Sequence, residues 1–276
     1  MIERWSSGLA DANMAQAILV DLEPMVRRHP WWQARARLTL DLLGRVGINP
    51  PSRVIDVGCG WGTTLLALER RGYAATGADI SHQTLDRLDR PDRTLVEIDL
   101  AAPWTPPDNF HPFDAALALD VIEHIDDDCA AVAALGQFVR PGGVVIVSVP
   151  ALPDLFNEFD QIQGHRRRYL PKTLQAAFAG SGLILDRWFW WGSWMVPLLR
   201  QTRGKNRSRP GDTPEATYAR YLKLPPWPAP LIFRAAFALE HHQALAGRLG
   251  QGTSLFAVAR KPRGIDSDQD TLTFIH

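Results

Sequence analysis

One segment of the sequence is most informative about the fold: Arg53-Val54-Ile55-Asp56-Val57-Gly58-Cys59-Gly60-Trp61-Gly62. A short run rich in β-branched residues ends at Val57, and three glycines then occupy alternate positions. The next residues, Thr63–Arg71, place leucines at helical spacing and stop at Gly72. This order predicts a strand, a tight loop and a helix.

The same alternation of strands and helices continues along the chain. Seven strands are predicted: Arg53–Val57, Ala74–Ala78, Leu95–Ile98, Ala115–Leu119, Val144–Val149, Gly182–Trp191 and Ser254–Arg260. Helices are predicted over Ser81–Leu88 and Asp127–Val139, from Pro171 to Gly180, and over Ala229–Leu245. Alternation of this kind predicts an α/β fold of the Rossmann-like type, with a seven-stranded, mostly parallel sheet and helices on both faces.

Four parts of the chain differ in character. Residues 1–50 predict an N-terminal helical cover, because apolar residues between Ala10 and Val46 recur at helical spacing with an interruption at Pro30. Residues 51–191 and 253–262 form the predicted core. Residues 192–252, rich in proline and with a basic middle, predict a lid inserted before the last strand, and residues 263–276 a polar tail.

Composition restricts the class of protein. The 276 residues are 46% hydrophobic and 22% charged, which is typical of a folded globular chain. Lys+Arg and Asp+Glu both number 30, so no overall field favours nucleic acid. The two cysteines, Cys59 and Cys129, form no metal-binding pair. Because no leader or apolar run of membrane-spanning length occurs, a cytoplasmic location is expected, with peripheral membrane contact left open.

The glycine loop favours one cofactor. A dinucleotide loop of the form GxGxxG requires glycine where Thr63 stands, which disfavours a nicotinamide oxidoreductase. The loop instead resembles the acidic-x-Gly-x-Gly-x-Gly motif of class I S-adenosylmethionine-dependent methyltransferases, matched by Asp56, Gly58, Gly60 and Gly62. The resemblance implies that this loop, with Cys59, lies against the methionine part of S-adenosylmethionine. The carboxylate of Asp56 suits the positive ammonium group there.

Further cofactor contacts are implied at the ends of the next strands. Asp79 lies 21 positions after Gly58, where Rossmann-like folds place the carboxylate that binds ribose hydroxyls. By the same resemblance Asp99 should reach the adenine amino group, with Ile80 and Leu100 on either side of the ring and Leu119 nearby. The alternative for both aspartates is that they only cap the turn that follows.

The loop after the fourth core strand carries candidate catalytic residues. Asp120, Glu123 and His124 match the DxxEH segment of ubiquinone-type small-molecule methyltransferases. His124 is a candidate general base, since a histidine accepts protons near neutral pH; the alternative is a packing role. Asp120, Glu123 and His124, completed by His165, would also suit a metal-assisted O-methyltransferase, with the metal unidentified.

A second segment points to the acceptor. His165, Arg167, Arg168 and Tyr169 match the GHxRRY segment of a bacterial branch of these enzymes linked to glycan and natural-product pathways. The resemblance places His165 among the catalytic candidates and the other three at the acceptor pocket, where arginines recognise carboxylate or phosphate. The alternative is that the arginines pair with the protein's own carboxylates, for instance Asp160.

The predicted lid is aromatic at its start and then basic. Four tryptophans lie within residues 188–194, and residues 200–223 carry seven Lys and Arg against Asp212 and Glu215. This composition is compatible with an anionic or lipid-linked acceptor. The expected reaction is O-methylation of a hydroxyl on a natural-product, glycan or lipid-linked intermediate. A non-catalytic cofactor-binding protein that uses residues 188–223 as its interaction surface is the rival interpretation.

Overall fold

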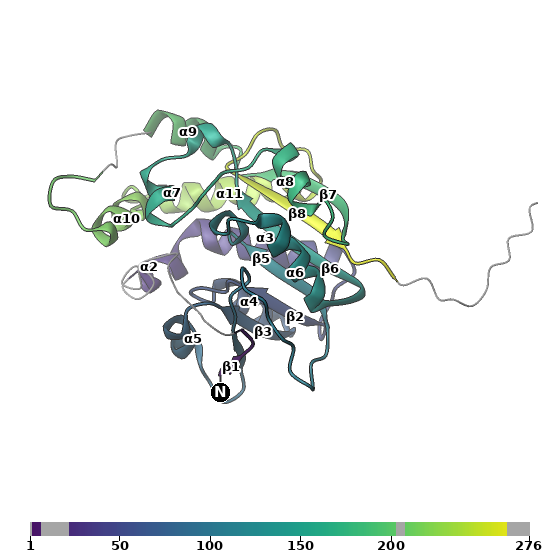
Figure 1. Cartoon of the computed structure of the whole chain (residues 1–276). Helices are drawn as coiled ribbons and strands as arrows, with labels where there is room; N and C mark the ends of the chain where they lie inside the picture. Colours follow the sequence, from purple (N-terminus) through teal and green to yellow (C-terminus); the bar gives the residue numbers. More distant parts are fainter. Residues whose placement is uncertain (1, 7–21, 203–207, 264–276) are drawn as a thin grey trace, which may run out of the picture.

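The computed structural model describes residues 2–6, 22–202 and 208–263, and these residues fold around one mixed sheet (Figure 1). The order of its strands is β1-β4-β3-β2-β5-β6-β8-β7. All neighbouring strands are parallel except β8, which runs antiparallel to β6 and β7. The strands are β1 (Ile2–Arg4), β2 (Arg53–Val57), β3 (Ala74–Asp79), β4 (Thr94–Glu97), β5 (Phe113–Leu119), β6 (Val139–Pro150), β7 (Ile184–Trp191) and β8 (Ser254–Arg260).

Helices cover both faces of the sheet. They are α2 (Glu23–Arg28), α3 (Pro30–Arg45), α4 (Thr63–Arg71), α5 (His82–Leu88), α6 (Asp128–Phe138), α7 (Glu158–Ile162), α8 (Pro171–Phe178), α9 (Met195–Thr202), α10 (Pro214–Leu222) and α11 (Ala229–Leu245). Ile55 of β2 packs in a core that includes α6 and α8. Val54, its neighbour, packs in a second core with α3, α4 and α11. Adjacent strand residues therefore face opposite helical layers, as the period of two in a strand requires.

The predicted α/β architecture is confirmed, with one difference in the sheet. The described residues form eight strands rather than seven, because β1 extends the sheet beside β4. This strand has only three residues, two of them charged, so no apolar alternation predicts it. The division into cover, core, lid and tail stays a prediction. The part of the predicted helical cover before residue 22 and the predicted tail from residue 264 lie outside the described residues.

The parallel strands direct four loops to one edge of the sheet. β2, β3 and β5 end at Val57, Asp79 and Leu119, and the loop after β4 follows Glu97. In open parallel sheets, ligands bind at the carboxyl ends of the strands. None of the described helices is long and apolar enough to cross a membrane.

Candidate functional site

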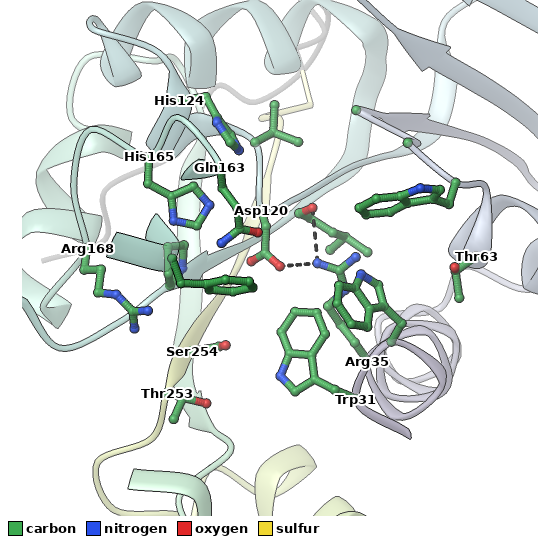
Figure 2. A pocket seen from close by; sticks show the side chains of 18 of the residues that line it. Trp31, Arg35, Thr63, Asp120, His124, Gln163, His165, Arg168, Thr253 and Ser254 are labelled. Atoms are coloured by element: carbon green, nitrogen blue, oxygen red, sulfur yellow. Dashed lines mark hydrogen bonds and ion pairs between the residues drawn. The ribbon is translucent and has the colours of Figure 1, made fainter. Parts of the chain in front are cut away.

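One cavity of about 890 Å³ lies at the carboxyl ends of these strands (Figure 2). It brings together nine of the ten residues predicted to contact the cofactor, namely Asp56, Gly58, Cys59, Gly60, Asp79, Ile80, Asp99, Leu100 and Leu119. The tenth, Gly62, is the N-cap of α4 and does not line the cavity. The predicted residues thus come from the ends of four strands and from the loops that follow them.

The backbone of the glycine loop is shaped for close approach. Gly58 and Gly60 have φ angles of +69° and +47°, which side chains with a Cβ rarely adopt. A Cβ on Gly58 would also overlap the side chain of Val121. At Gly60 a Cβ would meet only the carbonyl oxygen of Gly58, at 4.0 Å, among the atoms of the described residues. Gly60 therefore leaves open space where a ligand can approach the backbone.

The two strand-end aspartates also organise their loops. Asp79 accepts hydrogen bonds from Gly60 N at 2.8 Å and from Ser81 N at 2.9 Å. Asp99 accepts one from Ala101 N at 2.8 Å. Both side chains therefore stabilise turns, and both also line the cavity. The turn-capping alternative and the ligand-binding prediction are compatible for these residues.

Asp56 is a buried carboxylate with an unsatisfied oxygen. It is almost fully buried, and its Oδ2 has no hydrogen-bond partner within the described part of the chain. Burial raises its pKa to about 7, an effect that Arg35 opposes and Asp79 reinforces. A buried carboxylate without a partner is costly. A cationic ligand group in the cavity would satisfy it.

Arg35 on α3 is a site residue that the sequence analysis did not identify. Its guanidinium forms an ion pair with Asp120, donates to Leu119 O at 3.3 Å and lies 4.8 Å from the ring centre of Trp31 (Figure 2). Its Nε has no partner among the residues that the structure covers. No sequence signal distinguishes Arg35 from other polar residues of an amphipathic helix, since only the tertiary fold places α3 over the loops.

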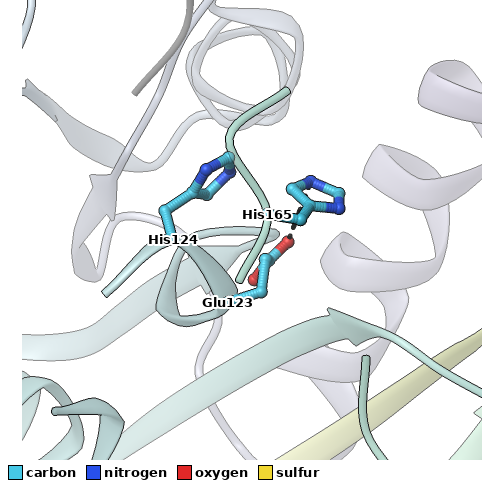
Figure 3. Close-up of side chains that lie close together, drawn as sticks. All are labelled: Glu123, His124 and His165. Atoms are coloured by element: carbon cyan, nitrogen blue, oxygen red, sulfur yellow. Dashed lines mark ion pairs between the residues drawn. The ribbon is translucent and has the colours of Figure 1, made fainter. Parts of the chain in front are cut away.

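Glu123, His124 and His165 lie together beside the cofactor loops (Figure 3). The two imidazole rings are 4.8 Å apart and nearly perpendicular. His165 Nδ1 is 3.0 Å from Asp160 Oδ1, and its Nε2 is 3.8 Å from Glu123 Oε1. Both histidines line the cavity, whereas Glu123 is fully buried and does not.

Burial and neighbouring charges shift the pKa values of these side chains. Burial lowers the pKa of His124 to about 3, and the neighbouring His165 contributes to the shift. Burial, reinforced by Asp120, raises the pKa of Glu123 well above its usual range. Burial alone would raise the pKa of Asp160, but its hydrogen bond to His165 and the charge of Arg168 hold it below the ordinary value. Asp160 is therefore the ionised partner of His165.

Three residues were predicted to bind the acceptor. In the structure they make contacts within the protein instead. Arg167 donates to Ile125 O and Asp126 O and pairs with Asp128. Tyr169 is buried and donates to Asp128. Neither lines the cavity. Arg168 does, but it donates to Asp160 Oδ1 at 2.8 Å and to Ala151 O at 3.1 Å. This geometry corresponds to the alternative in which the arginines pair with internal acceptors.

The remaining cavity wall is mostly apolar. It comes from α9, α11 and the loop before α11, and its residues include Met195, Leu198, Leu199, Leu224, Pro225, Phe233 and Phe237. Its polar residues include Gln163, Thr253 and Ser254, which are labelled in Figure 2. The cavity therefore has a polar end at the glycine loop and an apolar end beneath the inserted helices.

The chain resembles known proteins over this region. A family model described as a methyltransferase domain matches residues 31–187, more than half of the chain. The ubiquinone biosynthesis O-methyltransferase of Alkalilimnicola ehrlichii is 37% identical over 133 residues, which cover 43% of this chain and 53% of that protein. The trans-aconitate 2-methyltransferase of Azoarcus sp. is 31% identical over 173 residues, covering 60% of this chain and 64% of that protein. The chain thus spans less than two thirds of either relative.

A structural comparison agrees at the level of the fold. A chain from the solved complex of the Haloferax volcanii Trm112 methyltransferase activator with a methyltransferase matches with a TM-score of 0.55 and 16% identity. The match covers 90% of this chain and 96% of that one. The matching family model, the glycine loop and the acidic residues at the strand ends together place the chain in the class I S-adenosylmethionine-dependent methyltransferases.

Proposed function

We propose that this protein transfers the methyl group of S-adenosylmethionine to a hydroxyl of a small amphipathic acceptor. One observation carries the proposal: a single cavity contains the glycine loop, the His124–His165 pair and an apolar wall. A bound cofactor and an acceptor would therefore meet in front of the two histidines. Methyl transfer depends largely on such alignment.

The residues present fit the cofactor. Asp56, with its unsatisfied Oδ2, would hold the ammonium group, and the unpartnered Nε of Arg35 would face the carboxylate of the methionine part. Asp79 would bind the ribose hydroxyls and Asp99 the adenine amino group, with Ile80 and Leu100 on either side of the ring. The bound cofactor supplies an electrophilic methyl group with a good leaving group. Arg167 and Tyr169 are assigned no acceptor contact, because they are occupied elsewhere.

His165 is the better general base of the two histidines. Asp160 contacts its Nδ1 at 3.0 Å, which fixes the ring and stabilises a proton taken up at Nε2. The low pKa of His124 keeps this second ring neutral, so it can contact the acceptor without adding positive charge beside a sulfonium. Proton removal from a hydroxyl at Nε2 of His165 would then accompany attack of the oxygen on the methyl group.

Calorimetric titration tests the cofactor assignment directly. Purified protein should bind S-adenosylmethionine and S-adenosylhomocysteine but not NADH. Asp79→Ala should abolish this binding, whereas Asp108→Ala, an exposed aspartate outside the cavity, should not change it. Absence of binding by folded wild-type protein would refute the proposal.

A methyl-transfer assay then distinguishes an enzyme from a protein that only binds the cofactor. Labelled methyl transfer should be screened with phenolic, glycan-like and lipid-linked hydroxyl compounds. The O-methyltransferase named among the relatives supports starting with phenols. Cofactor binding without any acceptor-dependent product would favour the rival interpretation, in which residues 188–223 form an interaction surface.

Metal-assisted O-methylation is a second candidate, favoured by one observation. The ligand atoms of Glu123, His124 and His165 lie within 4.8 Å of one another, and both Glu123 oxygens have no hydrogen-bond partner in the part of the chain described. Atoms bound to one zinc ion at about 2.1 Å can be at most about 4.2 Å apart, so these side chains would have to close up. Elemental analysis of the purified protein and activity after chelation test this candidate. Full activity in metal-free protein would exclude it.

A further inference from the structure

We propose that the outer face of α11 docks on the surface of an anionic lipid bilayer. The α11 outer face is defined here as Leu231, Ile232, Ala235 and Leu239, together with Trp227 in the turn just before the helix. Docking does not depend on the methyl transfer proposed above, and it can be tested without any acceptor.

The exposure of these side chains is unusual for a surface helix. Trp227 and Leu239 are each 79% exposed, Ile232 is 57% exposed and Leu231 is 53% exposed. The opposite side of the same helix packs against the protein, since Phe237, Ala244 and Leu245 are buried in the core. A helix that packs one face on its own protein normally presents polar residues on the other. α11 is apolar on both sides.

The apolar residues form one continuous stripe. Positions 231, 235 and 239 are separated by four residues each, and position 232 lies beside them, so all four project from one side of the helix. From Leu231 to Leu239 the stripe extends about 12 Å at the helical rise, and Trp227 lies in the turn before the helix. A tryptophan at one end of such a stripe is typical of segments that insert into the headgroup region of a bilayer.

The charges around the stripe favour an anionic surface. Between residues 216 and 252 the one acidic residue is Glu240, which is buried and accepts hydrogen bonds from Gly192 N and Ser193 N. Lys223, Arg234 and Arg248 are exposed, and none of them forms an ion pair with any residue in the described ranges. Basic side chains near a membrane surface are attracted to anionic lipid.

A second copy of the chain fits this surface less well. A two-fold interface would place each protomer's Lys223, Arg234 and Arg248 near those of its partner, with no exposed carboxylate in residues 216–252 to neutralise them. Anionic headgroups supply the missing negative charge. The observations therefore favour the bilayer over self-association.

The surface is continuous with the cavity. Lys223, Leu224 and Pro225, which lie two to four positions before Trp227, line the apolar end of the cavity, as does Phe233 on α11. One short segment therefore contributes both to the proposed membrane contact and to the cavity wall. An amphiphile leaving the bilayer at this point would be next to the apolar end of the cavity.

Vesicle flotation of the full chain tests the proposal. Vesicles of phosphatidylcholine mixed with phosphatidylglycerol should carry the protein, whereas phosphatidylcholine alone should carry much less, and added salt should weaken the binding. The double variant Leu231→Gln/Leu239→Gln should lower the partition coefficient at least about tenfold. Lys223→Glu/Arg234→Glu should abolish the preference for anionic vesicles.

Matched controls keep the test decisive. Ile184→Gln removes an apolar side chain that is similarly exposed on β7, and Lys172→Glu reverses an exposed charge on α8. Both should bind vesicles like the wild type. The proposal is overturned if the wild type does not float with anionic vesicles, if the α11 variants float equally well, or if the protein is a stable dimer that these variants dissociate. Circular dichroism should show unchanged folding, because all substituted residues are on the surface.

Discussion

At the scale of single residues, the site is dominated by buried charges that the described protein atoms only partly satisfy. Asp56 and Arg35 each carry a buried polar atom without a partner in the described part of the chain, and both line the cavity. The desolvation of such groups costs free energy unless a ligand compensates it. The unsatisfied atoms therefore indicate where a zwitterionic ligand group would bind.

The pKa of Asp56 predicts that cofactor binding depends on pH. The carboxyl has an ordinary pKa of 3.8 and a raised pKa of about 7 in the fold, so between these values it is protonated before the ligand binds. A cationic ammonium requires the ionised form. Affinity should thus fall as the pH drops below about 7, by at most about tenfold per pH unit. Titration calorimetry in buffers of different ionisation enthalpy should detect proton release on binding.

The raised pKa of Asp56 also makes the folding stability depend on pH. Because the folded pKa lies above the unfolded pKa, the folded state loses stability as the pH rises from about 4 to about 7, where the carboxyl is ionised in the unfolded chain but still protonated in the fold. Asp56→Asn should remove both the pH-dependent affinity and this contribution. If the variant and the wild type showed the same pH dependence of binding, the assignment of the ammonium to Asp56 would be wrong.

Asp160 is expected to position His165. Asp160→Asn keeps the size of the side chain but removes the negative charge next to Nδ1, so kcat should fall about 100-fold with little change in KM. The pH profile of kcat should also move, which a purely structural role would not cause. Asp154→Asn, at a half-exposed aspartate that pairs with Arg200, is the matched control. An unchanged kcat in the Asp160 variant would contradict the role.

At the scale of elements, Glu240 connects α11 to the start of α9. Its Oε1 accepts hydrogen bonds from Gly192 N and Ser193 N, just before α9 begins at Met195. Burial raises the pKa of Glu240, while these backbone donors oppose the shift. The two helices form the apolar wall of the cavity, so this single side chain helps to hold that wall in place.

Loss of this connection should destabilise the inserted helices. Glu240→Leu leaves the buried Gly192 amide and the half-buried Ser193 amide without an acceptor, and we expect the free energy of unfolding to fall by about 2 kcal/mol. Glu240→Gln retains an acceptor oxygen and should cost less. Denaturant unfolding measures both. Gln243→Leu, an exposed position on the same helix, serves as control; equal stability of Glu240→Leu and the control would show that the contact contributes little.

At the scale of the whole molecule, the site exists only because distant segments converge. The cavity is lined by residues from α3, from the loops after β2, β3, β4 and β5, and from the helices inserted before β8 (Figure 1). A ligand in this cavity would contact parts of the chain separated by more than a hundred positions. Binding should therefore stabilise the fold as a unit.

This convergence predicts a measurable rise in thermal stability. A ligand that binds only the folded state at 100 times its Kd adds about 2.7 kcal/mol, which shifts Tm by several degrees in a protein of this size. S-adenosylhomocysteine should produce this shift in wild-type protein, as followed by scanning calorimetry. Asp79→Ala should show none. A shift of equal size in that variant would place the ligand elsewhere.

Much of the fold and half of the site follow from the sequence. The strand that ends at Val57, the glycines at 58 and 60 and the aspartates at 79 and 99 are local features, and strand ends in a parallel sheet share one edge. The sequence could therefore predict which of these residues gather at the cavity. It could not predict β1, because three largely polar residues carry no strand pattern.

Contacts between distant elements were decided only by the tertiary structure. Arg35 reaches Asp120 because α3 packs over the strand ends, and Arg167 and Tyr169 turn to Asp128 rather than to the cavity. A motif fixes residue types and their spacing, but the direction of a long side chain depends on which charged partner lies within its reach. Local sequence patterns were enough to predict the alternating strands and helices of the core and the loop that binds the cofactor in this family. The pairing of charges, which separates positioning residues from ligand-binding ones, required the folded chain.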